Sequence, residues 1–112
     1  MALTSKLITT SISSNSDAIY ASPVGHSNAV TTMFFCNYSG SDVYLESVNL
    51  VSGGTYTNVG VTNRIINHLL IPAGETFTFD SEKIILDSGD AIYATTDANS
   101  RLAVTICTLQ VS

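Results

Sequence analysis

The residue types that do acid–base or nucleophilic chemistry are few in this sequence, and they are not spaced for catalysis. His26 and His68 are the only histidines; the first lies in the turn-like stretch Pro23–Asn28 and the second inside an apolar run. Nucleophilic catalysis needs a nucleophile, a base and a group that orients the base. The sequence also lacks a Gly-x-Ser-x-Gly motif, a phosphate-binding loop and a dinucleotide fingerprint. We therefore expect no catalytic residues, no cofactor and no enzymatic activity.

Metal ligands are equally sparse. The two histidines and two cysteines are far apart in the sequence, whereas zinc sites pair their ligands at short spacings. Asp87 and Asp90 flank a tight turn and resemble a fragment of a calcium loop, but the further acidic ligands and the closing glutamate are missing. Turn chemistry explains the Asp87–Asp90 stretch better, so we expect no metal site.

Cys36 and Cys107 are the only cysteines. The N-terminus lacks the charged start, apolar stretch and cleavage site of a signal peptide, so two reduced and buried thiols are expected. A disulfide would require the two strands to be neighbours, and the sequence leaves that open.

The composition is poor in charge and rich in hydroxyl groups. Charged residues make up 12%, against about 25% in an average soluble domain, while Ser and Thr number 29 and Asn eight. Such strands either pack their outer faces against neighbours or simply reflect the preference of Thr for strands and of Ser and Asn for turns. Both interpretations remain open.

The net charge of −5 and the scattered cations exclude two classes of partner. The four basic residues stand singly along the chain, and a phosphate-tracking surface needs several cations together. The longest apolar runs are about four residues, far below the ~20 of a membrane helix. We expect a protein that binds neither nucleic acid nor membrane and that is made in a cytosol.

At 112 residues the chain is expected to form one domain, 1–112, with residues 1–16 as an N-terminal arm or an edge strand. Helical periodicity is absent, and turn residues recur every eight to twelve residues, as in sandwiches and barrels. This predicts an all-β fold, a single antiparallel sandwich of the jelly-roll or immunoglobulin-like kind with about eight or nine short strands. The predicted strands are Leu3–Ile12, Ala18–Ser22, Ala29–Tyr38, Asp42–Val51, Arg64–Ile71, Thr76–Asp80, Ile84–Leu86, Asp90–Thr96 and Leu102–Val111.

Some predicted strands are apolar on both faces, although a two-layer sandwich has one inner face per sheet. In Val30–Cys36, Phe34 and Cys36 share one face while Met33 and Phe35 share the other; Ile65–Ile71 is similar. A bulge that shifts the phase, a cap by the N-terminal segment, or a contact with another subunit would explain this. The last strand changes phase near Cys107, which predicts either a bulge near Cys107 and Thr108 or final residues that leave the domain and pair elsewhere.

A homo-oligomer or partner surface follows from these two-sided strands. The N-terminal arm and the Ser52–Thr62 loop, which has room for contacts, complete the surface that we predict. Its candidate residues are Met33, Phe35, Tyr56, Ile66, His68 and Leu70.

The order of four segments resembles small β-sandwich structural proteins of bacteriophage virions. These segments are Ala18–Gly25, Phe35–Ser41, Leu70–Phe77 and Ile84–Tyr93, followed by a terminal strand of alternating Val and Ile. Val24 and His26 depart from the family pattern, which more often has a small or basic residue after the Pro-x-Gly turn.

The resemblance implies a function but no catalytic residues. It implies a non-enzymatic virion protein, most of all a capsid decoration or cement protein that stabilises the head through symmetric contacts. It also implies a homo-oligomer, with a trimer favoured, and other virion proteins such as the major capsid protein as partners. The alternatives are a tail, neck or baseplate accessory protein, or a tail-tip module that binds a receptor or glycan.

Overall fold

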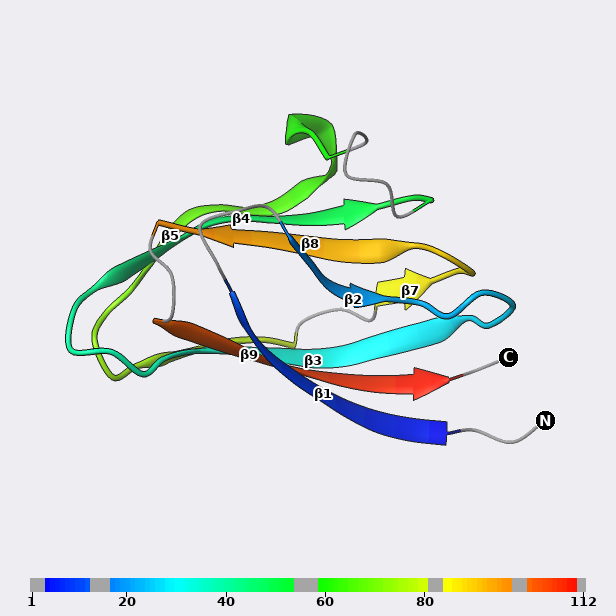
Figure 1. Cartoon of the computed structure of the whole chain (residues 1–112), viewed down its shortest axis with the longest axis horizontal. Coiled ribbons are helices and arrows are strands. Elements are labelled where there is room, and N and C mark those ends of the chain that lie inside the picture. Colours follow the sequence, from blue (N-terminus) through cyan, green and yellow to red (C-terminus); the bar gives the residue numbers. More distant parts are fainter. Residues whose placement is uncertain (1–3, 13–16, 54–58, 81–83, 98–100, 111–112) are drawn as a thin grey trace.

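The computed structural model describes residues 4–12, 17–53, 59–80, 84–97 and 101–110. Within them the chain forms nine strands in two facing layers (Figure 1). Each strand begins and ends within one residue of its predicted range, so the all-β prediction is confirmed. The strands are β1 (Thr4–Ile12), β2 (Asp17–Ala21), β3 (Asn28–Asn37), β4 (Val43–Val51), β5 (Arg64–Ile71), β6 (Thr76–Phe79), β7 (Ile84–Leu86), β8 (Ala91–Thr96) and β9 (Leu102–Gln110), with one 3-10 turn, η2 (Val61–Asn63), before β5.

The two layers are antiparallel sheets, and the chain crosses between them repeatedly, with β4 and β5 consecutive in one sheet and β6 and β7 consecutive in the other. Sheet A has the order β1-β9-β3-β6, and β7 continues along the edge of β3 beyond β6. Sheet B has the order β2-β8-β4-β5. Because the first and last strands pair with each other and the sheets share no ladder, this is the strand order of a jelly roll. Of the two sandwich types predicted, the jelly roll is the one observed.

The core lies between the sheets and contains three residues that the sequence analysis assigned to a partner surface. Met33 and Phe35 have no exposed surface, and Ile66 is 9% exposed. In the antiparallel register Met33 and Phe35 lie opposite Phe79 and Phe77 of β6, and cross-strand neighbours share a face. The prediction that these side chains meet a partner is therefore wrong, because β3 turns this face towards sheet B.

A bulge in β3 accounts for one of the phase changes. The register between β3 and β9 shifts between Val30 and Thr32, so Thr31 is the extra residue, and its hydroxyl donates to the Cys107 carbonyl at 3.2 Å. Val30 and Met33 consequently both enter the core. The bulge lies opposite Cys107 and Thr108, where the sequence predicted one, but the extra residue is in β3 and not in β9. β9 keeps an unbroken register with β1.

Two buried asparagines fix the connections around sheet B. The Asn37 amide donates to the carbonyls of Ser41 (2.8 Å) and Ile71 (2.9 Å), which ties the β3–β4 turn to the end of β5. The Asn49 amide donates to the Gly60 carbonyl and to Asn63 Oδ1, both at 2.8 Å. The end of the long loop after β4 is thus held against the outer face of sheet B.

Candidate interaction surfaces

Adjacent strands of sheet B each carry an irregularity at the same level. The β4–β8 register shifts between Leu45 and Ser47, which makes Glu46 the extra residue of β4. On β5, His68 lies at the level of Glu46 and has a φ of 53°, whereas its neighbours on either side keep their pairing with β4. Histidine is one of the few residues other than glycine that adopt this left-handed conformation with some frequency. The irregularities together turn Glu46 and His68 outwards.

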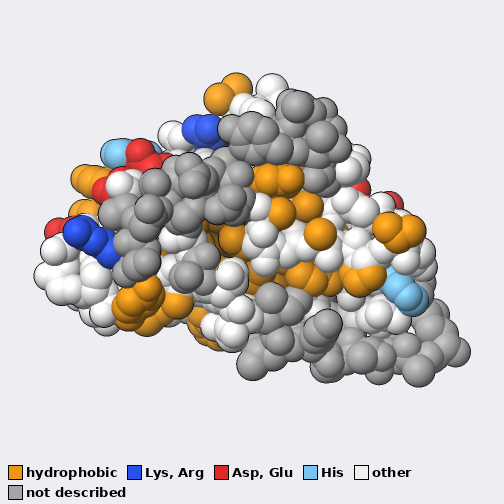
Figure 2. Space-filling view, viewed as in Figure 1, with side chains coloured by type: hydrophobic (Ala, Val, Ile, Leu, Met, Phe, Trp, Pro, Cys, Tyr) orange, Lys and Arg blue, Asp and Glu red, His pale blue; other side chains and the backbone are white. Residues whose placement is uncertain are grey.

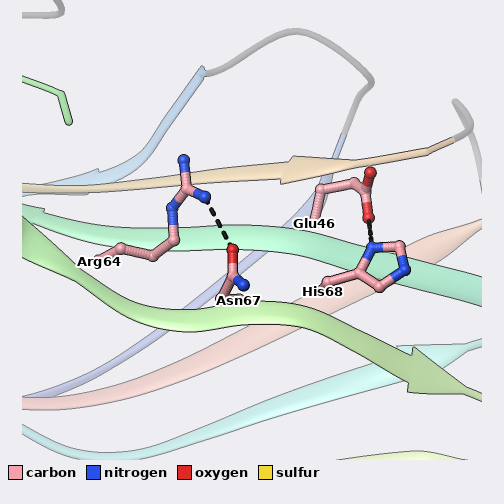
Figure 3. Close-up of polar contacts among 4 residues, drawn as sticks. All are labelled: Glu46, Arg64, Asn67 and His68. Carbon is pink, nitrogen blue, oxygen red and sulfur yellow. Dashed lines mark hydrogen bonds and ion pairs between the residues drawn. The ribbon is translucent and has the colours of Figure 1, made fainter. Parts of the chain in front are cut away.

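Glu46 and His68 form a hydrogen-bonded pair across the two strands (Figure 3). His68 Nδ1 lies 2.5 Å from Glu46 Oε1, and the carboxylate can only accept, so Nδ1 carries the proton. The imidazole also stacks on Tyr44, with ring centroids 4.1 Å apart and an interplanar angle of 7°. Packing and hydrogen bonding therefore fix the orientation of the His68 ring, although its side chain is 59% exposed.

Apolar side chains flank this pair on the same outer face. Tyr44, Ile65 and Leu70 are 36%, 37% and 44% exposed, and Leu70 lies directly opposite Tyr44 in the register. In Figure 2, histidine, acidic and hydrophobic side chains gather at the end of the molecule where β4 and β5 lie. We call this patch the β4–β5 surface and define it as Tyr44, Glu46, Ile65, His68 and Leu70.

An open recess of about 410 Å³ adjoins the β4–β5 surface. Arg64 Nη1 donates to Asn67 Oδ1 at 2.8 Å within it (Figure 3). Carboxylate, guanidinium, amide, imidazole and hydroxyl groups therefore meet in one small space. The lining residues are Glu46, Ser47, Val59, Arg64, Asn67, His68 and Thr95.

The structure brings two of the six candidate residues together at this patch. His68 and Leu70 are exposed there, Met33, Phe35 and Ile66 lie in the core, and Tyr56 lies outside the described residues. In the described part of the Ser52–Thr62 loop, Val59 packs against Val51, Ala91 and Tyr93. The Gly60 carbonyl accepts a hydrogen bond from the Asn49 amide.

Sequence analysis missed Tyr44 and Glu46 as partners of His68. Glu46 interrupts the alternation of its strand, which is the signal a bulge leaves in a sequence. The partner strand, however, follows a loop too long for its length to fix the register. The sequence pattern therefore indicated the irregularity at Glu46, but it did not show that His68 lies opposite it.

The outer face of sheet A has a different character: none of its described side chains is charged. Its residues are hydroxyl-bearing, small or apolar, and Phe34 (38% exposed) and Ile85 (58% exposed) are the large ones. We call this the sheet A face, made up of Thr9, Thr32, Phe34, Cys36, Thr76, Thr78, Ile85, Ala103, Thr105, Cys107 and Leu109.

Both cysteines belong to the sheet A face, and both are free and half-buried. Their strands are neighbours, but Cys36 lies opposite Ala103 while Cys107 lies opposite Thr32. Four residues along a strand span about 13 Å, whereas a disulfide needs Cα atoms within about 7 Å. The two thiols of one chain therefore cannot bond to each other in this fold.

The described residues hold neither a metal-ligand cluster nor a membrane-spanning helix. No three metal-ligating side chains lie together among them. The Asp87 carboxylate accepts a hydrogen bond from the Ser27 hydroxyl, and the Asp90 carboxylate accepts from the Gly53 and Asp87 amides. Over the same residues, no helix has the length and hydropathy needed to cross a bilayer.

Comparisons with known proteins identify a similar fold but no family. No family model matches the chain, and no curated protein sequence matches it significantly. A solved structure from work on Bacillus endospore appendages, described as a novel family of disulfide-linked pili, has a similar fold with a TM-score of 0.54. The similarity covers 97% of this chain and 84% of that one at 14% sequence identity. At that identity the match supports the sandwich architecture alone.

Proposed function

We propose that this chain is a non-enzymatic structural protein of a bacteriophage particle, a capsid decoration or cement protein, and that the β4–β5 surface is its contact with the particle. The observation that carries the proposal is the cluster of exposed Tyr44, Ile65 and Leu70 around the fixed Glu46–His68 pair. Exposed apolar side chains next to hydrogen-bonded polar groups are a combination that protein interfaces use.

The mechanism is cementing through repetition. Each contact is small, because the patch contains only five residues, but a symmetric particle offers the same site many times. Subunits that also contact one another, as in the trimer that the phage resemblance implies, bind several sites at once and gain avidity. The major capsid protein is the partner on this proposal, and the virion is the location.

The fold is compatible with this role without identifying the particle. The solved structure with a similar sandwich comes from a study of pili, and pili are structural proteins. That similarity supports the sandwich fold, while the phage assignment rests on the resemblance of the sequence segments.

A substitution in the patch tests the contact directly. We expect Leu70→Asp to reduce binding to purified particles by roughly a hundredfold, because it buries an unpaired charge at the contact. Val24→Asp is the matched control, since Val24 is 87% exposed in the β2–β3 turn, away from the patch. Equal binding of Leu70→Asp and wild-type protein in a co-sedimentation assay would exclude the β4–β5 surface as the contact.

The number of copies per particle tests the location. Quantitative mass spectrometry of purified particles should find copies on the order of hundreds, as expected when a protein decorates a symmetric head. A count on the order of ten would place the protein in the tail, neck or baseplate and overturn head decoration.

The polar recess favours a second candidate function, a glycan- or receptor-binding tail-tip module. Glu46, Arg64, Asn67 and His68 offer donors and acceptors to sugar hydroxyls in one open space. Retention of the protein on host cells, lost in Asn67→Ala and kept in Leu70→Asp, would support this alternative over cementing.

A further inference from the structure

The sheet A face differs from the rest of the molecular surface in carrying no charge on its described side chains. The described carboxylates lie in the connections between strands or on sheet B, and the described guanidinium groups of Arg64 and Arg101 do the same. A solvated sheet face normally alternates polar and charged residues with the core positions. Here the outward positions of β3 and β9 hold Thr, Phe, Cys and Ala.

The area of this face is sufficient for a stable protein contact. β1, β9 and β3 each contribute about nine residues, and β6 and β7 together contribute seven along the other edge of β3. With strands about 4.8 Å apart and a rise of about 3.3 Å per residue, the face covers about 540 Å² per molecule. Two molecules together bury about 1,100 Å², above the ~1,000 Å² that a specific interface needs.

We propose that a second copy of this chain packs its own sheet A face against this one, sheet on sheet about a two-fold axis. Charge selects a second copy as the occupant. Each copy carries a net charge of −5, so most orientations of two copies bring negative charges together. Two copies that meet through the described part of the sheet A face avoid this repulsion. No complementary charge for a differently charged partner is present on it.

The side chains of the face also complement themselves. Phe34 lies in the middle of it, flanked in register by Thr78 on β6 and Thr105 on β9. Two residues along β3, Cys36 lies beside Ala103. With the two-fold axis passing beside Phe34, each Phe34 lies over the small residues of the other copy, so a large side chain surrounded by small ones fits a second copy of the same face. This contact goes beyond the β4–β5 surface and does not depend on the particle proposed above.

Sedimentation velocity of the purified full-length chain in reducing buffer tests the proposal. We expect a concentration-dependent dimer, or a doubled trimer if subunits also associate through a third surface. Phe34→Asp should weaken the sheet A association by roughly a hundredfold, since it buries an unpaired carboxylate. Leu70→Asp is the matched control, because it adds the same charge to an equally exposed position on sheet B, and it should leave the sheet A association intact.

Thiol protection gives a second readout that needs no variant. Cys36 and Cys107 should be alkylated more slowly by iodoacetamide as the protein concentration rises, because association covers both. A monomer at about 100 μM with concentration-independent alkylation would overturn the proposal, as would an oligomer that Leu70→Asp dissociates and Phe34→Asp does not. The latter outcome would leave the role as a particle protein in place, but it would assign the β4–β5 surface to self-association and no longer to the contact with the particle.

Discussion

At the scale of single residues, His68 combines an unfavourable backbone with favourable side-chain contacts. Its φ of 53° costs a residue with a Cβ roughly 1 kcal/mol or more, whereas the stack on Tyr44 and the hydrogen bond to Glu46 offset this cost. These opposing contributions can be separated by substitution, because alanine loses the contacts and keeps the strain while glycine loses both.

We therefore predict that His68→Gly is more stable than His68→Ala by about 1 kcal/mol, the reverse of the usual order in a strand. Asn67 is the matched control, since its φ is not positive, and there alanine should be more stable than glycine by about 0.5–1 kcal/mol. Urea unfolding of the four variants measures both differences. The same order at both positions would mean that the left-handed conformation of His68 does not persist in solution.

Phe35 and Leu70 provide a second contrast between residues, since both were predicted at a partner surface. Phe35 is fully buried, so Phe35→Ala should lower the free energy of unfolding by about 3–5 kcal/mol. Leu70→Ala, at a position 44% exposed, should change it by less than about 1 kcal/mol. Thermal or urea unfolding decides this, and comparable losses in the two variants would contradict the burial of Phe35.

At the scale of elements, the positions of the strands could be predicted from the sequence but the orientation of their faces could not. Turn residues such as those at Asp87–Asp90 mark strand ends locally, and every strand range was accordingly close. Which face of β3 points inwards depends on its partner: β6 alternates cleanly, with Phe77 and Phe79 on one face, and its register opposite Met33 and Phe35 decides the question. That register is non-local information.

The candidate surface was only partly predictable for the same reason. His68 stood out as the histidine in an apolar strand, but its neighbours Tyr44 and Glu46 come from a strand about twenty residues earlier. Bulges moved the phase of β3, β4 and β5, and a one-residue shift exchanges the two faces of a strand. Without the pairing, a strand that is apolar on both faces cannot be divided into core and surface.

Contact between the two sheets can be tested through a tyrosine. Tyr20 of β2 packs against the core, and burial raises its pKa above the usual value of about 10, although a hydrogen bond with Thr108 of β9 acts in the opposite direction. Because the pKa of Tyr20 is higher in the folded protein than in the unfolded chain, folding favours the protonated phenol. The contribution of the protonated phenol to stability is complete below about pH 10, and it is lost as the pH rises through the folded pKa.

We predict that the wild-type protein loses stability more steeply above about pH 10 than Tyr20→Phe, which has no phenol to ionise there. Urea unfolding between neutral and strongly alkaline pH measures the two slopes. Tyr38→Phe controls for the removal of one exposed phenol elsewhere. Parallel curves for wild type and Tyr20→Phe would show that Tyr20 is as solvated in the folded protein as in the unfolded one.

At the scale of the whole molecule, the first and last strands pair with each other at one edge of sheet A. β1 pairs with β9 over its full length, from Thr4 opposite Gln110 to Ile12 opposite Leu102, so the first and last strands lie side by side (Figure 1). Ile12 is only 2% exposed and belongs to the core. Of the two roles expected for the first 16 residues, the edge strand describes residues 4–12.

Removing residues 1–12 should therefore unfold the domain instead of detaching an arm. The truncation exposes the hydrogen-bonding edge of β9 and removes Ile12 from the core, and an unpaired strand edge of that length promotes aggregation. We predict the loss of a cooperative thermal transition by circular dichroism. A synthetic peptide of residues 1–16 should restore the transition when added in excess, because strand addition rebuilds the same ladder. A scrambled peptide of equal composition is the control. If the truncated chain instead keeps its unfolding midpoint without peptide, β1 contributes little to the stability of the sandwich. In that case β9 is stable as the edge strand of sheet A.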